Sequence, residues 1–461
     1  MSPAPPRHLG RQLSGPTRQR RRAEKQRISQ SALRRQAGPN AKGTNPALAR
    51  TSADAVTPRP HTSIFQRLKC RARVLNMNKA LLAALILGIS IVGLSIGSTV
   101  PILALRLYQA GASNNQIGIM SALPAAGMML SAFMVNALGQ RLTRRQIYLL
   151  CFSLCALSVA ALELPDASLY SLGLARVAMG LGAGLIIILG ETWVNEMAED
   201  ASRGRLVAVY TTCFTFFQLL GPGLVSWLGT EGPAVLAIVS VGYAIAIAVV
   251  WLTLPQTDAA NLQEESRSFS VLGFIRIAPA LCVGILFFAF FDSVVLSLFP
   301  VYAAGHGYSI KLAALMVTII LLGDTAFQFP LGWLSDKLGR PGIYLGCGCI
   351  ALLIGLCLPL LMSAPGLLWP SLVILGAAAG GIYTLAIVLI GQSFSGADLV
   401  TANASAGLLW GIGSLLGPLL SGAAMSGGSY GLPLTLSAAA AVVVGFALSL
   451  VRQEQLDKVA Q

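Results

Sequence analysis

The sequence has 461 residues, of which 55% are hydrophobic and only 11% are charged, and its mean hydropathy is +0.71. Charged residues make up about a quarter of a soluble globular protein, so this composition excludes a water-soluble enzyme and predicts a protein embedded in lipid. The net charge of +14 does not indicate a nucleic-acid partner, because residues 1–79 hold 18 of the 32 basic residues and only two acidic ones. The rest of the chain carries a net charge of −2.

The basic segment at residues 1–77 is rich in Arg, Ser, Pro and Gln, a composition that predicts disorder. Three interpretations of this tail stay open. It binds anionic lipid headgroups, it is an organellar transit peptide, or the native chain starts at Met77, directly before the first apolar run. We favour the third.

Twelve apolar runs follow, each long enough to cross about 30 Å of hydrocarbon as a helix of about 20 residues. They are expected near 80–105, 116–138, 147–163, 168–192, 206–228, 232–254, 275–301, 311–334, 342–362, 367–393, 402–425 and 430–451. A polar linker at 255–273 divides them six and six. We therefore predict two six-helix halves, at 78–254 and 274–452, and a short C-terminal tail at 453–461.

The basic residues between these runs predict the orientation of the chain. With a cytoplasmic N-terminus, the outer segments hold only Arg106 and Lys311. The inner segments then hold twelve basic residues: Lys79, Arg141, Arg144, Arg145, Arg203, Arg205, Arg267, Arg276, Lys337, Arg340, Arg452 and Lys458. This asymmetry follows the positive-inside rule and places both termini in the cytoplasm.

The two predicted halves repeat each other at an offset of 196 residues. Gly111 and Ser113 correspond to Gly307 and Ser309, and the stretch 219–222 (Leu-Leu-Gly-Pro) recurs at 415–418. Secondary transporters use such repeats to build a central cavity between halves that rock about it. The predicted fold class is an all-α membrane protein with twelve transmembrane helices in two pseudo-symmetric halves.

The residues 332–340 (Gly-Trp-Leu-Ser-Asp-Lys-Leu-Gly-Arg) closely resemble the loop signature of the major facilitator superfamily, G-x-L-S/A-D-K/R-x-G-R. The corresponding first copy at 136–144 has Gln140 where the signature has Asp and Thr143 where it has Gly. Three further stretches resemble the YcaD-like branch of that superfamily: 190–196, 203–210 and 300–302. The resemblance implies the major facilitator fold and transport of a small solute.

Within the signature, Gly332 is expected to allow close helix approach and Gly339 a tight turn, while Lys337 and Arg340 stay at the cytoplasmic surface. The resemblance implies that Asp336 faces the start of the run at 206–228, where a carboxylate complements the helix dipole and latches one conformer. The alternative is a charged loop that only sets topology.

The charged residues inside the apolar runs include Arg176, Glu191, Asp292 and Asp324. A charge at the bilayer centre costs about 2.5–3.5 kcal/mol, so each requires an explanation. Arg176 resembles the superfamily's arginine of this run, associated with cavity electrostatics and proton coupling; the alternative is an arginine bound to backbone carbonyls. Either Asp292 or Asp324 is a candidate to carry a coupling proton, because desolvation disfavours the ionised carboxylate. Asp324 has the alternative of a structural hydrogen bond with Gln328.

Glu191 lies within reach of Arg144, Arg203 or Arg205, either as a gate or as a structural tie, and we favour the tie. Gly221-Pro222 and Gly417-Pro418 each place a bend in a run, as gating helices need, with helix packing as the alternative.

The predicted function is proton-coupled efflux of a small solute by an antiporter in the bacterial cytoplasmic membrane. The nearest alternative is an uptake symporter for a sugar or other polar metabolite; a non-transporting sensor and a membrane-embedded transferase are less favoured. A transferase would usually bring a catalytic His, Asp or metal cluster to the membrane interface, and the three histidines are His8 and His61 in the tail and His306 in an outer loop. We expect no enzymatic activity, cofactor, metal or nucleic acid, and a monomer whose partners are the solute, membrane lipid and protons.

Overall fold

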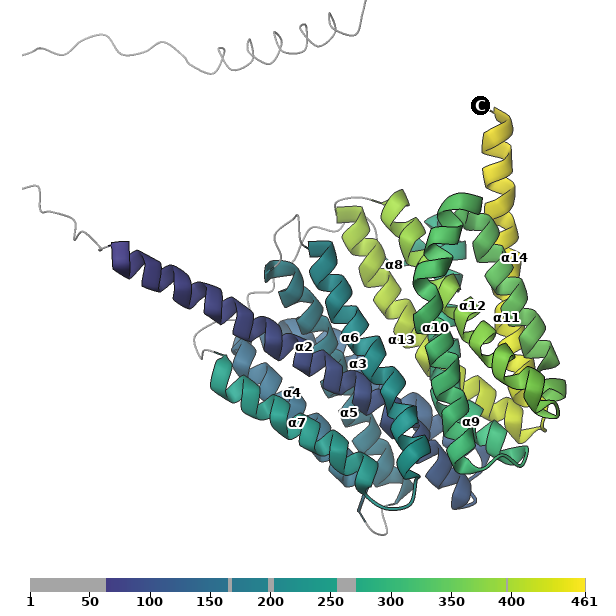
Figure 1. Ribbon diagram of the computed structural model, residues 1–461, viewed down its shortest axis with the longest axis horizontal. Coiled ribbons are helices and arrows are strands. Elements are labelled where there is room, and N and C mark those ends of the chain that lie inside the picture. The colour runs from purple at the N-terminus through teal and green to yellow at the C-terminus, as the bar shows by residue number, and fades with distance from the viewer. Residues whose placement is uncertain (1–63, 165–167, 198–202, 255–270, 395–396, 461) are drawn as a thin grey trace, which may run out of the picture. The chain divides into compact units, whose positions relative to one another are not determined.

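The computed structural model describes residues 64–164, 168–197, 203–254, 271–394 and 397–460. Within these residues the chain forms the helices α2 (Ile64–Gln109), α3 (Asn114–Arg141), α4 (Arg144–Ala161), α5 (Leu169–Met197), α6 (Arg203–Leu228), α7 (Ala234–Thr253), α8 (Val271–Ile277), α9 (Pro279–Gly305), α10 (Ile310–Leu338), α11 (Arg340–Met362), α12 (Pro365–Ser393), α13 (Ala397–Ser426) and α14 (Gly431–Ala460) (Figure 1). In this part of the chain, twelve helices are long and apolar enough to cross a membrane, and the ends of their membrane-spanning parts agree with the predicted runs to within four residues.

The predicted tail, linker and C-terminus are only partly within the described residues. Helix α2 begins at Ile64, so it extends into the segment expected to be tail, while residues 1–63 lie outside the described part. Residues 255–270 of the linker also lie outside it, and the last linker residues begin the short helix α8. Helix α14 continues through the expected C-terminal tail to Ala460.

The helices run between two ends of the bundle, which we name by their residues. The Gly111 end carries the turns at Gly111 and Gly307, both with positive φ, each followed by a serine that caps the next helix (Ser113 and Ser309). The linker end carries the start of α9 and the turn at Gly339 between α10 and α11. We call α2–α7 the first half and α9–α14 the second half.

Close helix crossings repeat between the halves at the same offset of 196 residues. A Cβ on Gly180 of α5 would collide with the carbonyl oxygen of Pro124 in α3, and one on Gly376 of α12 would collide with that of Ile320 in α10. Further equivalent contacts are Gly127 with Val177 and Gly323 with Val373, and Gly88 with Tyr148 and Gly284 with Tyr344. Because small residues let helix backbones approach in lipid, the repeated glycines confirm the predicted pseudo-symmetry.

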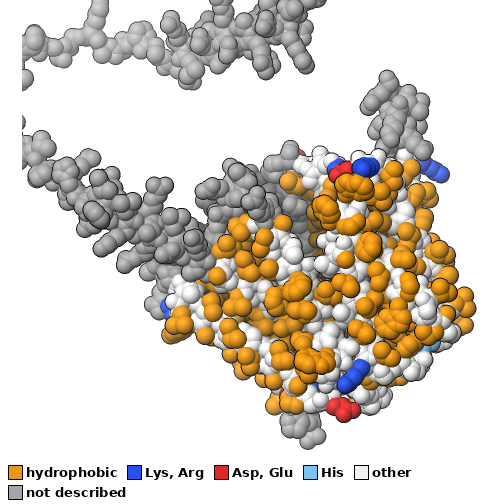
Figure 2. Space-filling view, viewed as in Figure 1, with side chains coloured by type: hydrophobic (Ala, Val, Ile, Leu, Met, Phe, Trp, Pro, Cys, Tyr) orange, Lys and Arg blue, Asp and Glu red, His pale blue; other side chains and the backbone are white. Residues whose placement is uncertain are grey.

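The outer surface of the bundle is apolar, as contact with lipid requires. Figure 2 shows hydrophobic side chains spread over the visible face, with charged ones mainly towards its ends. Leu157, Leu252 and Leu360, on three different helices, have 70%, 81% and 75% of their surface exposed. Such exposure of large apolar side chains indicates a lipid-facing surface rather than a water-facing one.

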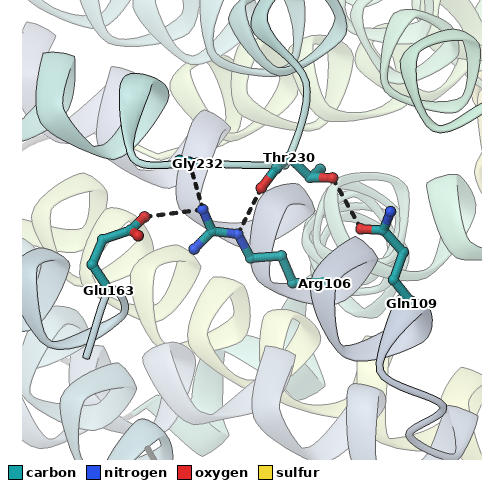
Figure 3. A network of polar contacts seen from close by, with 5 residues as sticks. All are labelled: Arg106, Gln109, Glu163, Thr230 and Gly232. Carbon is teal, nitrogen blue, oxygen red and sulfur yellow. Dashed lines mark hydrogen bonds and ion pairs between the residues drawn. The ribbon is translucent and has the colours of Figure 1, made fainter. Parts of the chain in front are cut away.

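The first half is tied at the Gly111 end by Arg106, the last-turn arginine of α2 (Figure 3). Its Nη2 pairs with Glu163 Oε1 at 3.0 Å and donates to the carbonyl oxygen of Gly232 at 2.8 Å. Its Nε donates to the carbonyl oxygen of Thr230 at 2.9 Å, and the Thr230 hydroxyl donates to Gln109 at 2.9 Å. One guanidinium thus joins the end of α2 to the segments that follow α4 and α6.

Replacing Arg106 by alanine is expected to lower the free energy of unfolding by about 2 kcal/mol, because the buried Thr230 carbonyl loses its donor. Glu163→Gln is the matched control and should cost less than about 1 kcal/mol, because it weakens only a half-exposed ion pair. Denaturant unfolding in detergent micelles measures both. Equal losses in the two variants would contradict a role for the carbonyl contacts.

The halves meet mainly through two helix pairs, α3 with α13 and α6 with α10. Asn114 Nδ2 donates to the carbonyl oxygen of Met425 at 3.2 Å, and the backbone N–H of Asn115 donates to Ser426 Oγ at 3.1 Å. In the second pair, Gly223 lies beside Thr318. These contacts lie between the middle of the bundle and the Gly111 end, which is therefore the closed end of the interface.

Candidate functional site

Towards the linker end, α6 and α10 diverge (Figure 1). A cavity of about 550 Å³ is lined by residues of both helices. Its lining comes from α6, α10 and α12 and comprises Thr212, Thr215, Thr325, Gln328, Phe329, Gly332, Trp333, Asp336 and Thr384. Small-molecule sites usually have volumes of about 300–1,000 Å³. The cavity thus has the size of a solute site and lies where the two halves separate.

Asp292 of α9 bridges the two halves through Gln218 of α6. The Gln218 Nε2 donates to both carboxylate oxygens of Asp292, at 3.3 Å and 3.2 Å. Asp292 forms no ion pair within the described part of the chain. The sequence predicts Asp292 as an embedded charge but not this partner, although an amide inside the apolar run of α6 is a signal that would have found Gln218.

Asp324 of α10 is 6% exposed and accepts a hydrogen bond from Gln328 Nε2 at 3.1 Å, the contact predicted as its structural alternative. Its side chain packs against Gly380 of α12, where a Cβ would collide with Oδ1. Asp292 and Asp324 lie close enough to interact electrostatically. Two carboxylates of neighbouring helices therefore share one interior region, and each contacts a neutral amide.

Arg176 of α5 is 1% exposed and lies nearer the Gly111 end, apart from the residues that line the cavity. Its Nη1 donates to Thr99 Oγ1 at 3.2 Å and to Met179 Sδ at 3.8 Å, while Nε and Nη2 have no hydrogen-bond partner among the described residues. The structure does not bring Arg176 together with Asp292 or Asp324 in an ion pair. The alternative of an arginine held by backbone carbonyls is not supported either, because its described hydrogen-bond acceptors are a hydroxyl and a thioether sulfur.

Glu191 of α5 is exposed and lies in the part of that helix nearest the linker end. Its carboxylate lies near enough to Tyr210 of α6 and Tyr383 of α12 to act electrostatically on both. The side chains of Arg203 and Arg205, two of its predicted partners, lie outside the described part of the chain. The choice between gate and tie stays a prediction.

The loop signature lies at the linker end of α10. Asp336 is 60% exposed, lines the cavity and pairs with Arg340 at 2.6 Å. Lys337 Nζ lies 3.8 Å from the centre of the Trp333 ring. Gly339 has φ +93°, so it makes the tight turn that the signature predicts.

Two details of the signature differ from expectation. A Cβ on Gly332 would meet no atom within 4 Å, so this glycine makes no close helix approach and lines the cavity instead. Asp336 contacts the arginine of its own loop, because α6 and α10 are apart at this end, and the side chains at the start of α6 lie outside the described residues. The latch stays a prediction for another conformer.

The two Gly-Pro pairs lie at close helix crossings. A Cβ on Gly221 would collide with the backbone of Gly97 in α2, and one on Gly417 would lie 2.7 Å from the carbonyl oxygen of Phe290 in α9. The carbonyl of Pro418, in turn, lies against Gly118 of α3, across the interface between the halves. Packing accounts for both glycines, and the gating role stays a prediction.

A family model described as Major Facilitator Superfamily matches residues 85–320 and 281–460. The chain belongs to the Major Facilitator Superfamily. Two bacterial relatives cover most of it. The MFS-type transporter YfkF of Bacillus subtilis is 27% identical over 353 residues, which cover 73% of this chain and 87% of the relative. The MFS-type transporter YcaD of Escherichia coli is 26% identical over 342 residues, covering 72% and 86%.

Solved structures of three Major Facilitator Superfamily transporters are similar in fold. The nucleoside transporter NupG superposes with a TM-score of 0.63 at 13% identity, covering 82% of this chain and 98% of its own. An inward-facing bacterial homologue of the lysosomal transporter Spinster gives 0.63 at 17% identity, covering 82% and 97%. A D-xylose–proton symporter gives 0.60 at 19% identity, covering 80% and 97%. Membership and fold together confirm the predicted superfamily and its YcaD-like branch and identify a transporter of a small solute.

Proposed function

We propose that the protein is a proton-coupled antiporter that exports its solute across the bacterial cytoplasmic membrane. The observation that carries the proposal is the bond between Asp292 and Gln218, which joins the two halves through an ionisable group. A hydrogen bond to an ionised carboxylate is roughly twice as strong as one between neutral groups. Proton binding at Asp292 therefore weakens a contact between the halves.

This arrangement has the property that an exchanger needs. While Asp292 is ionised and unoccupied, Gln218 helps to hold the halves closed at the Gly111 end. Either a proton or a bound solute that engages the carboxylate competes with that bond and favours the opposite conformer. The protein then changes conformation readily only when it carries a proton or the solute. Protons therefore cross the membrane in one direction in exchange for solute in the other.

The charge distribution supports a cytoplasmic linker end. The segments there carry Arg141, Arg144, Arg145, Lys337 and Arg340, and the positive-inside rule assigns such an end to the cytoplasm. The cavity then opens inward, as in the inward-facing Spinster homologue of similar fold. A cavity open to the cytoplasm is where an exporter collects its solute.

Uptake by symport is the second candidate, because four threonines and Gln328 line the cavity with groups that can hydrogen-bond a sugar. A D-xylose–proton symporter also has a similar fold. Export is favoured because an embedded carboxylate, Asp292, joins the two halves and the cavity opens at the end that the basic residues assign to the cytoplasm. The two candidates differ in the direction in which protons move: against the solute in an antiporter and with it in a symporter.

A pH-sensitive dye inside proteoliposomes tests both candidates with a panel of solutes. For an antiporter, adding solute outside vesicles with an acidic lumen should raise the lumenal pH, because protons leave as solute enters. A symporter should instead acidify the lumen when solute is added at equal pH. Protein-free liposomes are the control. Solute entry that leaves the lumenal pH unchanged would rule out proton coupling.

A further inference from the structure

Three aromatic side chains of the second half form a cluster that the sequence gives no reason to connect. They are Phe288 of α9, Tyr383 of α12 and Trp410 of α13. The rings of Phe288 and Tyr383 stack with centroids 4.9 Å apart and planes 20° apart, and Trp410 meets Tyr383 edge-on at 5.3 Å. Phe288 is buried, whereas Tyr383 and Trp410 are only partly covered. The cluster therefore consists of one buried ring, that of Phe288, and two partly accessible rings.

The two partly covered rings lie on segments of α12 and α13 that border the region between the halves. Tyr383 precedes Thr384, which lines the cavity, and follows by one helical turn Gly380, which packs against Asp324. Trp410 precedes Gly411, where a Cβ would lie 2.8 Å from Met129 of the first half. Both rings therefore come from helix segments that border the first half and the cavity, and neither ring is among the described residues that line the cavity.

The carboxylates described around this region are those of Glu191, Asp324 and Asp336. Glu191 and Asp324 both act electrostatically on Tyr383, and Asp336 lines the cavity mouth, where it pairs with Arg340. No basic side chain is among the described residues that line the cavity. Lys337 lies on the Trp333 ring and Arg176 is buried towards the Gly111 end.

Aromatic faces and carboxylates attract cations and disfavour anions, because the ring face and the carboxylate both present negative potential. We infer that the solute is a lipophilic cation, with an apolar or aromatic body that packs on Tyr383 and Trp410 and a charge that lies near Glu191 and Asp324. The inference rests on the proposed transport function and names its substrate class. Such a cation would compete with protons for the interior carboxylates.

Two ions of the same shape and opposite charge test the inference: tetraphenylphosphonium and tetraphenylborate. The purified full chain in detergent should bind radiolabelled tetraphenylphosphonium saturably in equilibrium dialysis. Unlabelled tetraphenylphosphonium should displace it at least about ten-fold more effectively than tetraphenylborate does. Tyr383→Ala and Trp410→Ala should each weaken binding about ten-fold, whereas Tyr383→Phe, which keeps the ring, should change it less than about two-fold.

The matched control is Trp227→Ala, which removes a 73% exposed tryptophan from α6 near the Gly111 end and should leave binding unchanged. Size-exclusion chromatography establishes that each variant is folded. Equal displacement by tetraphenylborate, or normal binding by folded Tyr383→Ala and Trp410→Ala, would overturn the inference.

The binding assay needs no gradient, so its failure is distinct from that of the proposed function. Proton-coupled flux of an anionic or neutral solute, without tetraphenylphosphonium binding, would refute the cation site and leave proton-coupled export intact. Saturable, ring-dependent tetraphenylphosphonium binding without any lumenal pH change would support the cation site and refute the coupling.

Discussion

Replacing Asp292 by asparagine is expected to abolish the increase in solute flux that an imposed pH gradient produces, so that the flux equals the flux measured without a gradient. Asparagine has nearly the same shape and can still bond to Gln218, but it cannot bind or release a proton. The halves should therefore still assemble and exchange solute down its own gradient. Radiolabelled solute uptake with and without an imposed pH gradient separates the two processes.

Asp324→Asn is the matched control, since Asp324 is also an embedded carboxylate bonded to a glutamine, but that glutamine lies on its own helix. We expect it to change affinity for the solute more than the response to the gradient. Unchanged gradient-driven flux in folded Asp292→Asn would exclude Asp292 as the coupling group. Loss of coupling in Asp324→Asn but not in Asp292→Asn would instead assign the coupling proton to Asp324 of α10.

Valine at Gly180 or at Gly376 is expected to destabilise the bundle by at least about 3 kcal/mol, because its Cβ would collide with a backbone carbonyl that cannot move aside cheaply. The two variants should behave alike, since the glycines and the carbonyls they face correspond at the offset of 196 residues. The monodisperse yield after detergent extraction and the apparent Tm measure the effect.

Gly346→Val provides the control, because a Cβ at Gly346 in α11 would meet no atom within 4 Å. It should fold with nearly the yield of the unaltered chain, at a cost of about 1 kcal/mol or less. If Gly180→Val or Gly376→Val is as stable as Gly346→Val, the crossings of α3 with α5 and of α10 with α12 are looser than described.

The sequence predicts the packing of this protein much better than its site, and the repeat explains why. Helix boundaries depend on apolar runs, and close crossings depend on glycines, so both recur at the offset of 196 residues. The candidate site residues break the repeat: at this offset Asp292 corresponds to Ile96, Asp324 to Met128 and Arg176 to Leu372. The repeat thus predicts the helix boundaries and the close crossings. The embedded charges mark single candidate residues, but they do not predict which residues contact one another in the site.

What the sequence could not predict is how the halves lie against each other. The contact between Gln218 and Asp292, and that between Asn114 and Met425, join residues far apart in the chain whose distance depends on the conformer. The same holds for Asp336, expected to face α6 but bonded to Arg340 where α6 and α10 diverge. Sequence patterns within one helix carry no information about which end of the interface between the two halves is open.

The most direct test of alternating access is the distance between spin labels at the linker ends of α6 and α10, for example at Val209 and Leu338, both exposed. Double electron–electron resonance measures it in a cysteine-free background. The proposed mechanism predicts that a shorter distance becomes more populated as the pH falls, because a proton on Asp292 weakens the bond that keeps the Gly111 end closed. The change should disappear in Asp292→Asn. One fixed distance at every pH and solute concentration would contradict the proposed mechanism.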